Sequence, residues 1–242
     1  MFVHGLEGHP EGAKVLGLRV QGFDVVAPNM HMSLYKLARR NSVVRQLLRL
    51  TEVRVVGLLT PLALALTLAA HAFVGALALL TAALLWFAAR RKPLIARALA
   101  RSFDACVAIQ AAALREVAPD VVIGSSWGGA VVAELILRGS WTGPTILLAP
   151  AIQVVLERTG RGGVARHNEQ LRACSMQMRV SGAPLVIFHD PSDATIPYAD
   201  SVRLAEASPI QLETVDAGGH ALLGLLESGQ LAAAIRAVGS RS

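Results

Sequence analysis

Residues 57–89 form an apolar run that contains no charged side chain. A run of this length either enters a bilayer or is covered by a large interface, because exposing so much contiguous apolar surface to water is unfavourable. As one straight helix it would be about 50 Å long, well beyond the roughly 30 Å hydrocarbon core of a membrane. The length therefore predicts a helical hairpin with arms at 53–71 and 75–91, turning near His71 to Gly75.

Basic residues flank this apolar run on both sides. Between Tyr35 and Arg101 the chain holds eleven Lys or Arg and one acid, Glu52, whereas the formal charge of the whole chain is only +6. Lys and Arg on both flanks are typical of a membrane segment whose two ends are cytoplasmic. Outside this segment 12 Lys or Arg stand against 16 Asp or Glu, so the net positive charge is confined to it and we expect no nucleic-acid partner. They are Lys36, Arg39, Arg40, Arg45, Arg49 and Arg54 before the run, and Arg90, Arg91, Lys92, Arg97 and Arg101 after it.

The predicted arms are short for a transmembrane hairpin. Each would span about 25–28 Å, which is the lower limit for crossing a bilayer. A re-entrant hairpin is therefore an alternative to a spanning one. In a soluble protein the same segment would be a hydrophobic lid, or a dimerisation hairpin in a homo-oligomer.

The segment before the apolar run carries a second membrane signal. Apolar residues recur there at helical spacing with arginines around them, which predicts a basic amphipathic helix at a membrane interface. The alternative is a solvated helix with ordinary surface arginines. We treat residues 36–101 as one basic and hydrophobic helical insertion, and residues 1–35 and 102–242 as the folded domain. The apolar residues are Leu34, Leu37, Val44, Leu47 and Leu48, and the arginines are Arg39, Arg45 and Arg49.

The composition agrees with a chain that meets lipid or a large interface. Hydrophobic residues make up 53% of the 242 residues, charged residues only 17%, and the mean hydropathy is +0.49. Two cysteines, Cys106 and Cys174, are too few for a disulfide framework, so we expect reduced packing residues. The first residues lack a signal-peptide pattern, which favours a membrane-associated protein whose folded domain is cytoplasmic.

Outside the insertion, strand patterns alternate with helix patterns. The strand-like runs are continuous and apolar, as in a parallel sheet covered by helices on both faces. We therefore predict an α/β fold with a mostly parallel sheet. The predicted strands are 2–3, 23–27, 120–124, 144–149, 184–188 and 210–215; the predicted helices are 11–21, 102–117, a helix ending near Arg138, 198–207 and 221–237. Residues 150–180 are expected to be polar and mixed, with a flexible basic loop at Gly160, Gly162 and Gly163.

Residues 120–138 are the part of the domain that points to chemistry. They read as a strand, a sharp turn and a helix, and the turn contains Gly124-x-Ser126-x-Gly128. In this pattern a serine is held at a strand-to-helix corner with its hydroxyl exposed, and glycines flank it because the corner leaves no room for Cβ atoms. The following helix points unpaired N–H groups toward any anion that forms at the serine.

The domain resembles the α/β-hydrolase superfamily, particularly its small one-domain esterases. The resemblance rests on three motifs in the family's chain order of serine, acid and histidine. Ser126 lies in the turn described above, Asp193 lies in the loop His189–Pro197 after a strand, and His220 ends a Gly-Gly-His turn after the last strand. The resemblance implies that Ser126 is a nucleophile, that His220 is its base, and that Asp193 orients His220.

The acid has a rival within the same loop. Asp190 precedes Asp193 by three residues, whereas Asp216 lies too near the histidine turn to be a comfortable partner. The Asp-x-x-x-Pro spacing matches the family loop and favours Asp193. Without the resemblance, an Asp in such a loop would be interpreted as an Asx turn or a helix cap.

The resemblance also implies an oxyanion hole, in which two backbone N–H groups face the developing negative charge. One would belong to Trp127, directly after the nucleophile, and the other to Leu6 in the loop that begins at His4. The Trp127 ring is either a substrate-facing wall or a packing residue. No metal-ligand cluster or nucleotide-binding pattern is visible, so we expect neither metal nor cofactor. The remaining loop histidines, His9 and His31, are interpreted as surface residues.

Together these features predict a membrane-associated serine hydrolase of the carboxylesterase, thioesterase or lipase-like kind. Its partner would be a small-molecule or lipid acyl ester. One alternative is a hydrolase fold without catalysis that serves as a membrane-anchored binding or scaffold protein. Another is an acyltransferase, which would pass the acyl group to an alcohol instead of water.

Overall fold

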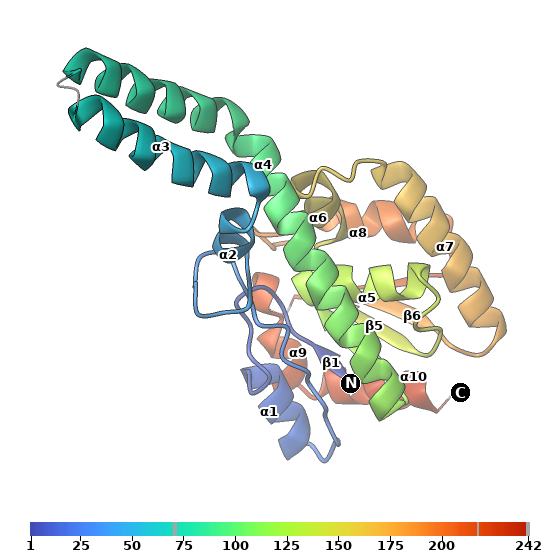
Figure 1. Ribbon diagram of the computed structural model, residues 1–242. Helices are drawn as coiled ribbons and strands as arrows, with labels where there is room; N and C mark the ends of the chain where they lie inside the picture. Colours follow the sequence, from blue (N-terminus) through green and yellow to red (C-terminus); the bar gives the residue numbers. More distant parts are fainter. Residues whose placement is uncertain (70–71, 217, 241–242) are drawn as a thin grey trace.

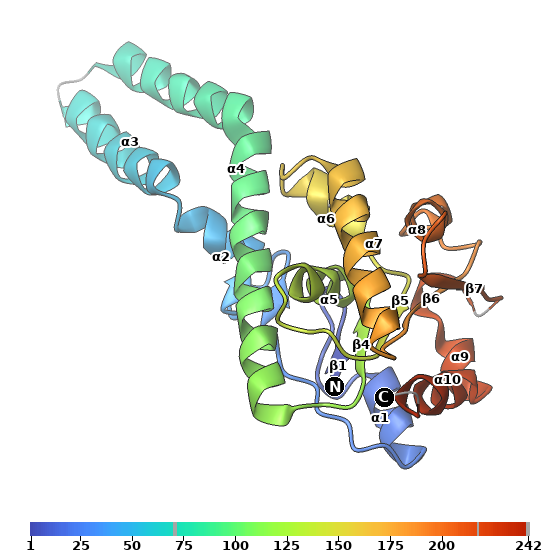
Figure 2. The same cartoon turned by 90° about the vertical axis from the view of Figure 1, so that its right-hand side faces the viewer.

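The computed structural model describes residues 1–69, 72–216 and 218–240. Five parallel strands form a central sheet in the order β1-β4-β5-β6-β7. Parallel neighbours need crossover connections, so helices lie on both faces of the sheet (Figures 1 and 2). The strands are β1 (Phe2–Val3), β4 (Val122–Ser125), β5 (Thr145–Leu148), β6 (Leu185–His189) and β7 (Gln211–Thr214). The prediction of an α/β fold with a parallel sheet is confirmed.

Alternation along the strands divides the core into two layers. In β6, Leu185 and Ile187 face one layer, while Val186 and Phe188 face the other. The first layer packs against α4 (Phe73–Val117), α5 (Trp127–Leu137), α6 (Ile152–Arg158), α7 (Val164–Val180) and α8 (Tyr198–Ala205). The second packs against α1 (Ala13–Val20), α9 (Leu223–Glu227) and α10 (Gln230–Gly239). Because successive side chains of a strand point to opposite faces, continuous apolar runs bury both faces.

The apolar run forms two helices that project from the domain. Helix α3 (Thr51–Ala69) lies beside the first half of α4, and the pair extends away from the sheet (Figure 1). The expected turn begins at His71, which lies outside the described residues. Helix α4 then continues without a break to Val117, so the helix predicted at 102–117 is the end of a 45-residue helix that crosses the expected boundary at 101/102.

Two predictions between residues 23 and 48 were wrong. Residues 23–27 are not a strand; they run beside β1, and Phe2 donates one backbone hydrogen bond to Val26 (2.9 Å) without forming a ladder. The amphipathic helix is reduced to α2 (Val43–Leu48), because the preceding residues form two short parallel strands, β2 (Met32–Ser33) and β3 (Asn41–Ser42), joined by a loop.

The stretch 150–180 is more regular than the sequence indicated. It contains α6 and α7, and only the short connection between them, which holds the three glycines, is a loop. The buried residues of α7 are Leu171, Ser175 and Met178, at helical spacing. A narrow apolar stripe in an otherwise polar helix is a weak periodic signal, which explains why the helix was missed.

The two cysteines are expected to differ in reactivity. Cys106 is completely buried in α4, and burial raises the pKa of its thiol to about 12, whereas Cys174 is partly exposed. Only the thiolate is nucleophilic, so iodoacetamide at neutral pH should alkylate Cys174 and leave Cys106 unmodified. Mass spectrometry of the folded protein would show this. Equal alkylation of both cysteines would contradict the packing described for α4, and denatured protein provides the fully labelled control.

Candidate active site

Ser126 occupies a strained corner between β4 and α5. Its φ of 54° and ψ of −118° lie outside the conformations that L-residues usually adopt. The corner is tight, because a Cβ on Gly124 would lie only 2.8 Å from the carbonyl oxygen of Gly128. Such strain persists only where surrounding structure enforces it, and it is common at functional sites. The sharp turn expected from the sequence is therefore present, and the Ser126 side chain is only partly buried.

The structure brings Ser126, His220 and Asp193 into one chain of hydrogen bonds. Ser126 Oγ lies 2.9 Å from His220 Nε2, and His220 Nδ1 lies 2.7 Å from Asp193 Oδ2. Because the carboxylate can only accept, Nδ1 carries the proton and Nε2 is free to accept from the serine hydroxyl. The three residues come from different loops, which follow β4, β6 and β7 at the carboxyl edge of the sheet.

The Asp193 carboxylate is held from both sides. Its side chain is completely buried, and Oδ1 accepts the backbone N–H groups of Thr195 (2.7 Å) and Ile196 (3.0 Å). Burial raises its pKa, but the hydrogen bonds from Ile196, His220 and Thr195 outweigh burial and hold the pKa below its usual value of 3.8. Asp193 is therefore ionised at neutral pH, as an acceptor behind an imidazolium must be.

Asp190, the rival acid, binds Ser192 and the backbone of the histidine turn. Its Oδ1 accepts the N–H (2.7 Å) and the hydroxyl (2.6 Å) of Ser192, and its Oδ2 accepts the N–H of Gly219 (2.8 Å). These contacts fasten the turn that carries His220 to the loop that carries Asp193. Asp190 therefore supports the histidine turn, whereas Asp193 contacts the histidine directly.

The predicted oxyanion residues flank Ser126. Trp127 is the first residue of α5, so its N–H has no acceptor within the helix. On the other side, the position that a Cβ of Gly5 would take is 3.4 Å from Ser126 Cβ, and Leu6 follows directly. The Trp127 ring is buried against Phe103 in an edge-to-face contact with centroids 5.4 Å apart. Of the two roles considered for this ring, the structure thus shows packing.

A further histidine, which the sequence analysis did not single out, reaches the same carboxylate. His189, the last residue of β6, is completely buried and places Nε2 3.3 Å from Asp193 Oδ2. Burial lowers its pKa, against the opposing effect of Asp193, so that the ring is neutral at pH 7. The signal was its position four residues before the candidate acid, at the end of an apolar strand.

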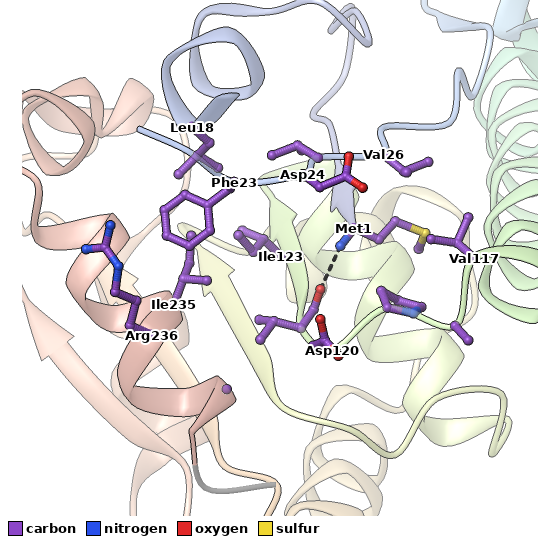
Figure 3. Close-up of a pocket in the computed structure, with 15 residues that line it drawn as sticks. Met1, Leu18, Phe23, Asp24, Val26, Val117, Asp120, Ile123, Ile235 and Arg236 are labelled. Carbon is purple, nitrogen blue, oxygen red and sulfur yellow. Dashed lines mark hydrogen bonds between the residues drawn. The ribbon is translucent and has the colours of Figure 1, made fainter. Parts of the chain in front are cut away.

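A hollow of about 490 Å³ lies away from these residues. Its walls include Met1, Asp24, Ile123 and Arg236, at the amino ends of β1 and β4 (Figure 3). Ser126 follows the carboxyl end of β4, so the hollow and the triad lie at opposite ends of the sheet. Across the described parts of the chain, no group of three His, Cys, Asp or Glu side chains is arranged to hold a metal ion.

Comparisons with known proteins give one weak similarity. No protein-family model matches the chain, and no curated protein matches it. Among solved structures, the chain is similar to a thermophilic esterase from the Planctomycetes species Thermogutta terrifontis in its propionate-bound form, with 21% identity and a TM-score of 0.32. The match covers 60% of this chain and spans 64% of that esterase. A similarity this low does not assign the chain to a family.

Proposed function

We propose that the protein is a serine hydrolase with an α/β-hydrolase-type fold that cleaves an ester or thioester through an acyl-enzyme. The observation that carries this proposal is the continuous chain from Ser126 through His220 to Asp193, with both links at hydrogen-bond distance. The strained backbone of Ser126 supports it, because that conformation is costly and exposes the hydroxyl. A scaffold without catalysis would have no need for either feature.

The geometry supports a two-step reaction. The Ser126 hydroxyl attacks the acyl carbonyl while His220 Nε2 takes its proton, and Asp193 stabilises the resulting imidazolium. The negative charge on the carbonyl oxygen faces the N–H groups of Leu6 and Trp127. His220 then gives its proton to the leaving alcohol or thiol. Water, activated by the same histidine, attacks the acyl-enzyme and releases the acid and the free serine.

A fluorophosphonate probe tests this proposal directly. Wild-type protein in lipid should be labelled at Ser126, because the serine oxygen displaces fluoride from the probe and forms a phosphonate ester only when a base activates it. Ser126→Ala should not be labelled, whereas Ser125→Ala, at the neighbouring serine, should retain labelling. Peptide mapping identifies the modified residue. The proposal would be overturned if folded wild-type protein stayed unlabelled. It would also be overturned if the Ser126→Ala variant were labelled as strongly as wild type.

We also propose that α3 and residues 73–91 of α4 form a membrane hairpin, with the folded domain on the cytoplasmic face. Both helices are long and apolar enough to cross a bilayer. Helix α3 has 19 residues, or about 28 Å, and none of its side chains is buried by the rest of the protein. Basic residues at the base of both helices favour the cytoplasmic side. The exposed apolar side chains include Leu58, Leu62, Leu66, Phe73, Leu77 and Leu84.

Membrane association is expected to survive washing with salt or alkali and to be lost with detergent. Acidic substitutions at the centres of the two helices, Leu62→Asp with Leu84→Asp, should shift the protein out of the membrane fraction, since each charge costs about 2.5–3.5 kcal/mol at mid-bilayer. The matched control is Val180→Asp, an exposed apolar residue on α7, which should remain bound. Wild-type protein that stays in the supernatant as a monomer without detergent contradicts the hairpin.

A further inference from the structure

The loop between β2 and β3 exposes apolar side chains beside the candidate oxyanion loop. Leu34, Tyr35 and Leu37 are 41%, 64% and 54% exposed. Residues 34–40, which we name the contact loop, contain no helix or strand and lie before α2. Three large apolar side chains so close together on a surface loop indicate a site of contact with an apolar partner.

Polar contacts hold the contact loop against the oxyanion loop. Glu7 Oε1 accepts hydrogen bonds from the Ser33 hydroxyl and the Leu34 N–H, both at 2.7 Å. From the other direction, Arg39 Nη1 donates to the carbonyl oxygen of Gly8 (3.1 Å). Glu7 and Gly8 follow Leu6 directly. The apolar side chains of the contact loop therefore point outward from a backbone that is fastened to the oxyanion loop.

The fold places the triad on the side of the domain that carries the projecting helices. Helix α4 ends at Val117 and leads into β4, so the two elements run in opposite directions. The end of α4 that carries residues 73–91 therefore lies toward the carboxyl edge of the sheet, where β4 delivers Ser126. The contact loop precedes α2, which leads into α3 on the same side (Figures 1 and 2).

Positive charge surrounds this side of the molecule. Lys36 and Arg40 lie in the contact loop, and Arg45 and Arg49 lie in or next to α2. Of these, Lys36 alone has an acidic partner in the described chain, Glu7 at 3.7 Å. Apolar side chains surrounded by unneutralised cations match an anionic lipid surface, which supplies acyl chains and phosphates together.

We propose that the contact loop binds the surface of an anionic phospholipid bilayer, and that the substrate is an ester or thioester held in that bilayer. The proposal rests on the hydrolase and hairpin functions given above. The hairpin determines which side of the domain faces the lipid. The contact loop then holds the oxyanion loop next to the lipid surface. An acyl group leaving the bilayer then meets Ser126 from the carboxyl edge of the sheet.

Two substrates distinguish an effect on bilayer contact from an effect on the catalytic reaction. Full-length protein is reconstituted in vesicles of phosphatidylcholine with phosphatidylglycerol, and hydrolysis is measured for a water-soluble short-chain p-nitrophenyl ester and for its long-chain counterpart dissolved in the vesicles. The variant Leu34→Ser/Tyr35→Ser/Leu37→Ser should lose about tenfold in the rate on the vesicle-held ester and little on the soluble one. The control, Leu16→Ser/Val20→Ser/Val180→Ser, removes apolar residues of α1 and α7 that are at least as exposed and should change neither rate.

The outcomes distinguish the two proposals. Normal turnover of both esters by the contact-loop variant overturns the lipid-contact surface while leaving the hydrolase intact. The preference for anionic lipid is overturned if wild type cleaves the vesicle-held ester equally fast with and without phosphatidylglycerol. The variant Arg40→Gln/Arg49→Gln tests the same preference by removing two of the cations. Wild-type protein that cleaves neither ester and is not labelled at Ser126 overturns the hydrolase itself.

A second inference comes from the buried histidine behind the triad and does not depend on the membrane. His189 Nδ1 lies 2.7 Å from the hydroxyl of Ser201, while Nε2 lies between Asp193 Oδ2 (3.3 Å) and the carbonyl oxygen of Ile196 (3.2 Å). Two acceptors at Nε2 require a proton there, so Nδ1 accepts from Ser201. The neutral ring is thus fixed in a single tautomer that donates toward the candidate acid.

The geometry points to His189 as a positioning residue for Asp193. With it, the carboxylate has donors on all sides: two backbone N–H groups at Oδ1, and the His220 and His189 rings at Oδ2. A carboxylate held in this way cannot rotate away from His220 during proton transfer. His189 is completely buried behind Asp193 and acts only through it.

Paired substitutions test this role. His189→Phe keeps a ring but removes the donor, so kcat on the soluble ester should fall about tenfold with KM unchanged, since a hydrogen bond to a charged group is lost. His189→Gln keeps an N–H donor near the position of Nε2 and should recover most of kcat. Equal kcat in wild type and His189→Phe would overturn the assignment. So would equal losses in both variants, because packing alone would not distinguish them.

Discussion

Asparagine in place of Asp193 is expected to lower kcat about 10⁴-fold while leaving the fold intact. The backbone N–H groups of Thr195 and Ile196 would continue to bind the side-chain oxygen at the Oδ1 position. The amide NH₂ would therefore take the place of Oδ2 and donate to His220 Nδ1, while the His189 N–H would keep the carbonyl oxygen of Ile196 as its acceptor. The histidine would then carry its proton on Nε2, facing Ser126, and could no longer accept the serine proton.

The comparison with Asp190→Asn makes this expectation specific. Asp190 accepts the Gly219 N–H through Oδ2, so its replacement should loosen the histidine turn and lower both the melting temperature and kcat, the latter by less than about 100-fold. Steady-state kinetics on a soluble ester and thermal unfolding in detergent measure both effects. A larger loss of kcat in Asp190→Asn than in Asp193→Asn would contradict this assignment and indicate that Asp190 is the acid that orients His220.

Alanine in place of Gly128 is expected to destabilise the protein by at least about 3 kcal/mol, since no flexible side chain can move to make room. The new Cβ would overlap the carbonyl oxygen of Val3 and lie 2.5 Å from that of His4. Strand β1 and helix α5 meet at this glycine, so accommodating the methyl group would push the loop that begins at His4 away from Ser126.

Gly57→Ala is the matched control. A Cβ at Gly57, on α3, would meet no atom within 4 Å, and alanine favours helix more than glycine does. Thermal unfolding of the detergent-solubilised variants, followed by circular dichroism, should show a large loss for Gly128→Ala and none for Gly57→Ala. An unchanged unfolding midpoint for Gly128→Ala would contradict the close approach of β1 and α5.

The central part of the candidate site could be predicted from the sequence, because the turn at Ser126 is specified locally. A continuous apolar strand, two glycines and a helix start occur within a few residues of each other, and the structure has the corresponding elements. The grouping of Asp193 and His220 with Ser126 came instead from the resemblance in chain order, and the structure has them in contact. Their catalytic roles remain a proposal that the variants above test.

The features that the sequence did not predict share a physical cause: tertiary contacts determine the local structure at each of them. Residues 23–27 have strand-like side chains but lie at the edge of the sheet with a single backbone bond to β1. The apolar residues of 34–48 suit a helix, yet Glu7 and Arg39 fasten the contact loop in place of it. The sequence placed His189 only at the start of the loop after a strand, and the folded chain shows that it meets the carboxylate of Asp193.

The pairing of β1 with β4 has a consequence for how the protein is made. Phe2 pairs with Ile123, so a ribosome must synthesise the whole of α3 and α4 before the first strand has a partner. Both helices are therefore synthesised before the sheet can be completed. The loop that begins at His4 therefore stays unpaired on one side of the two helices until the strand that leads to Ser126 emerges on the other.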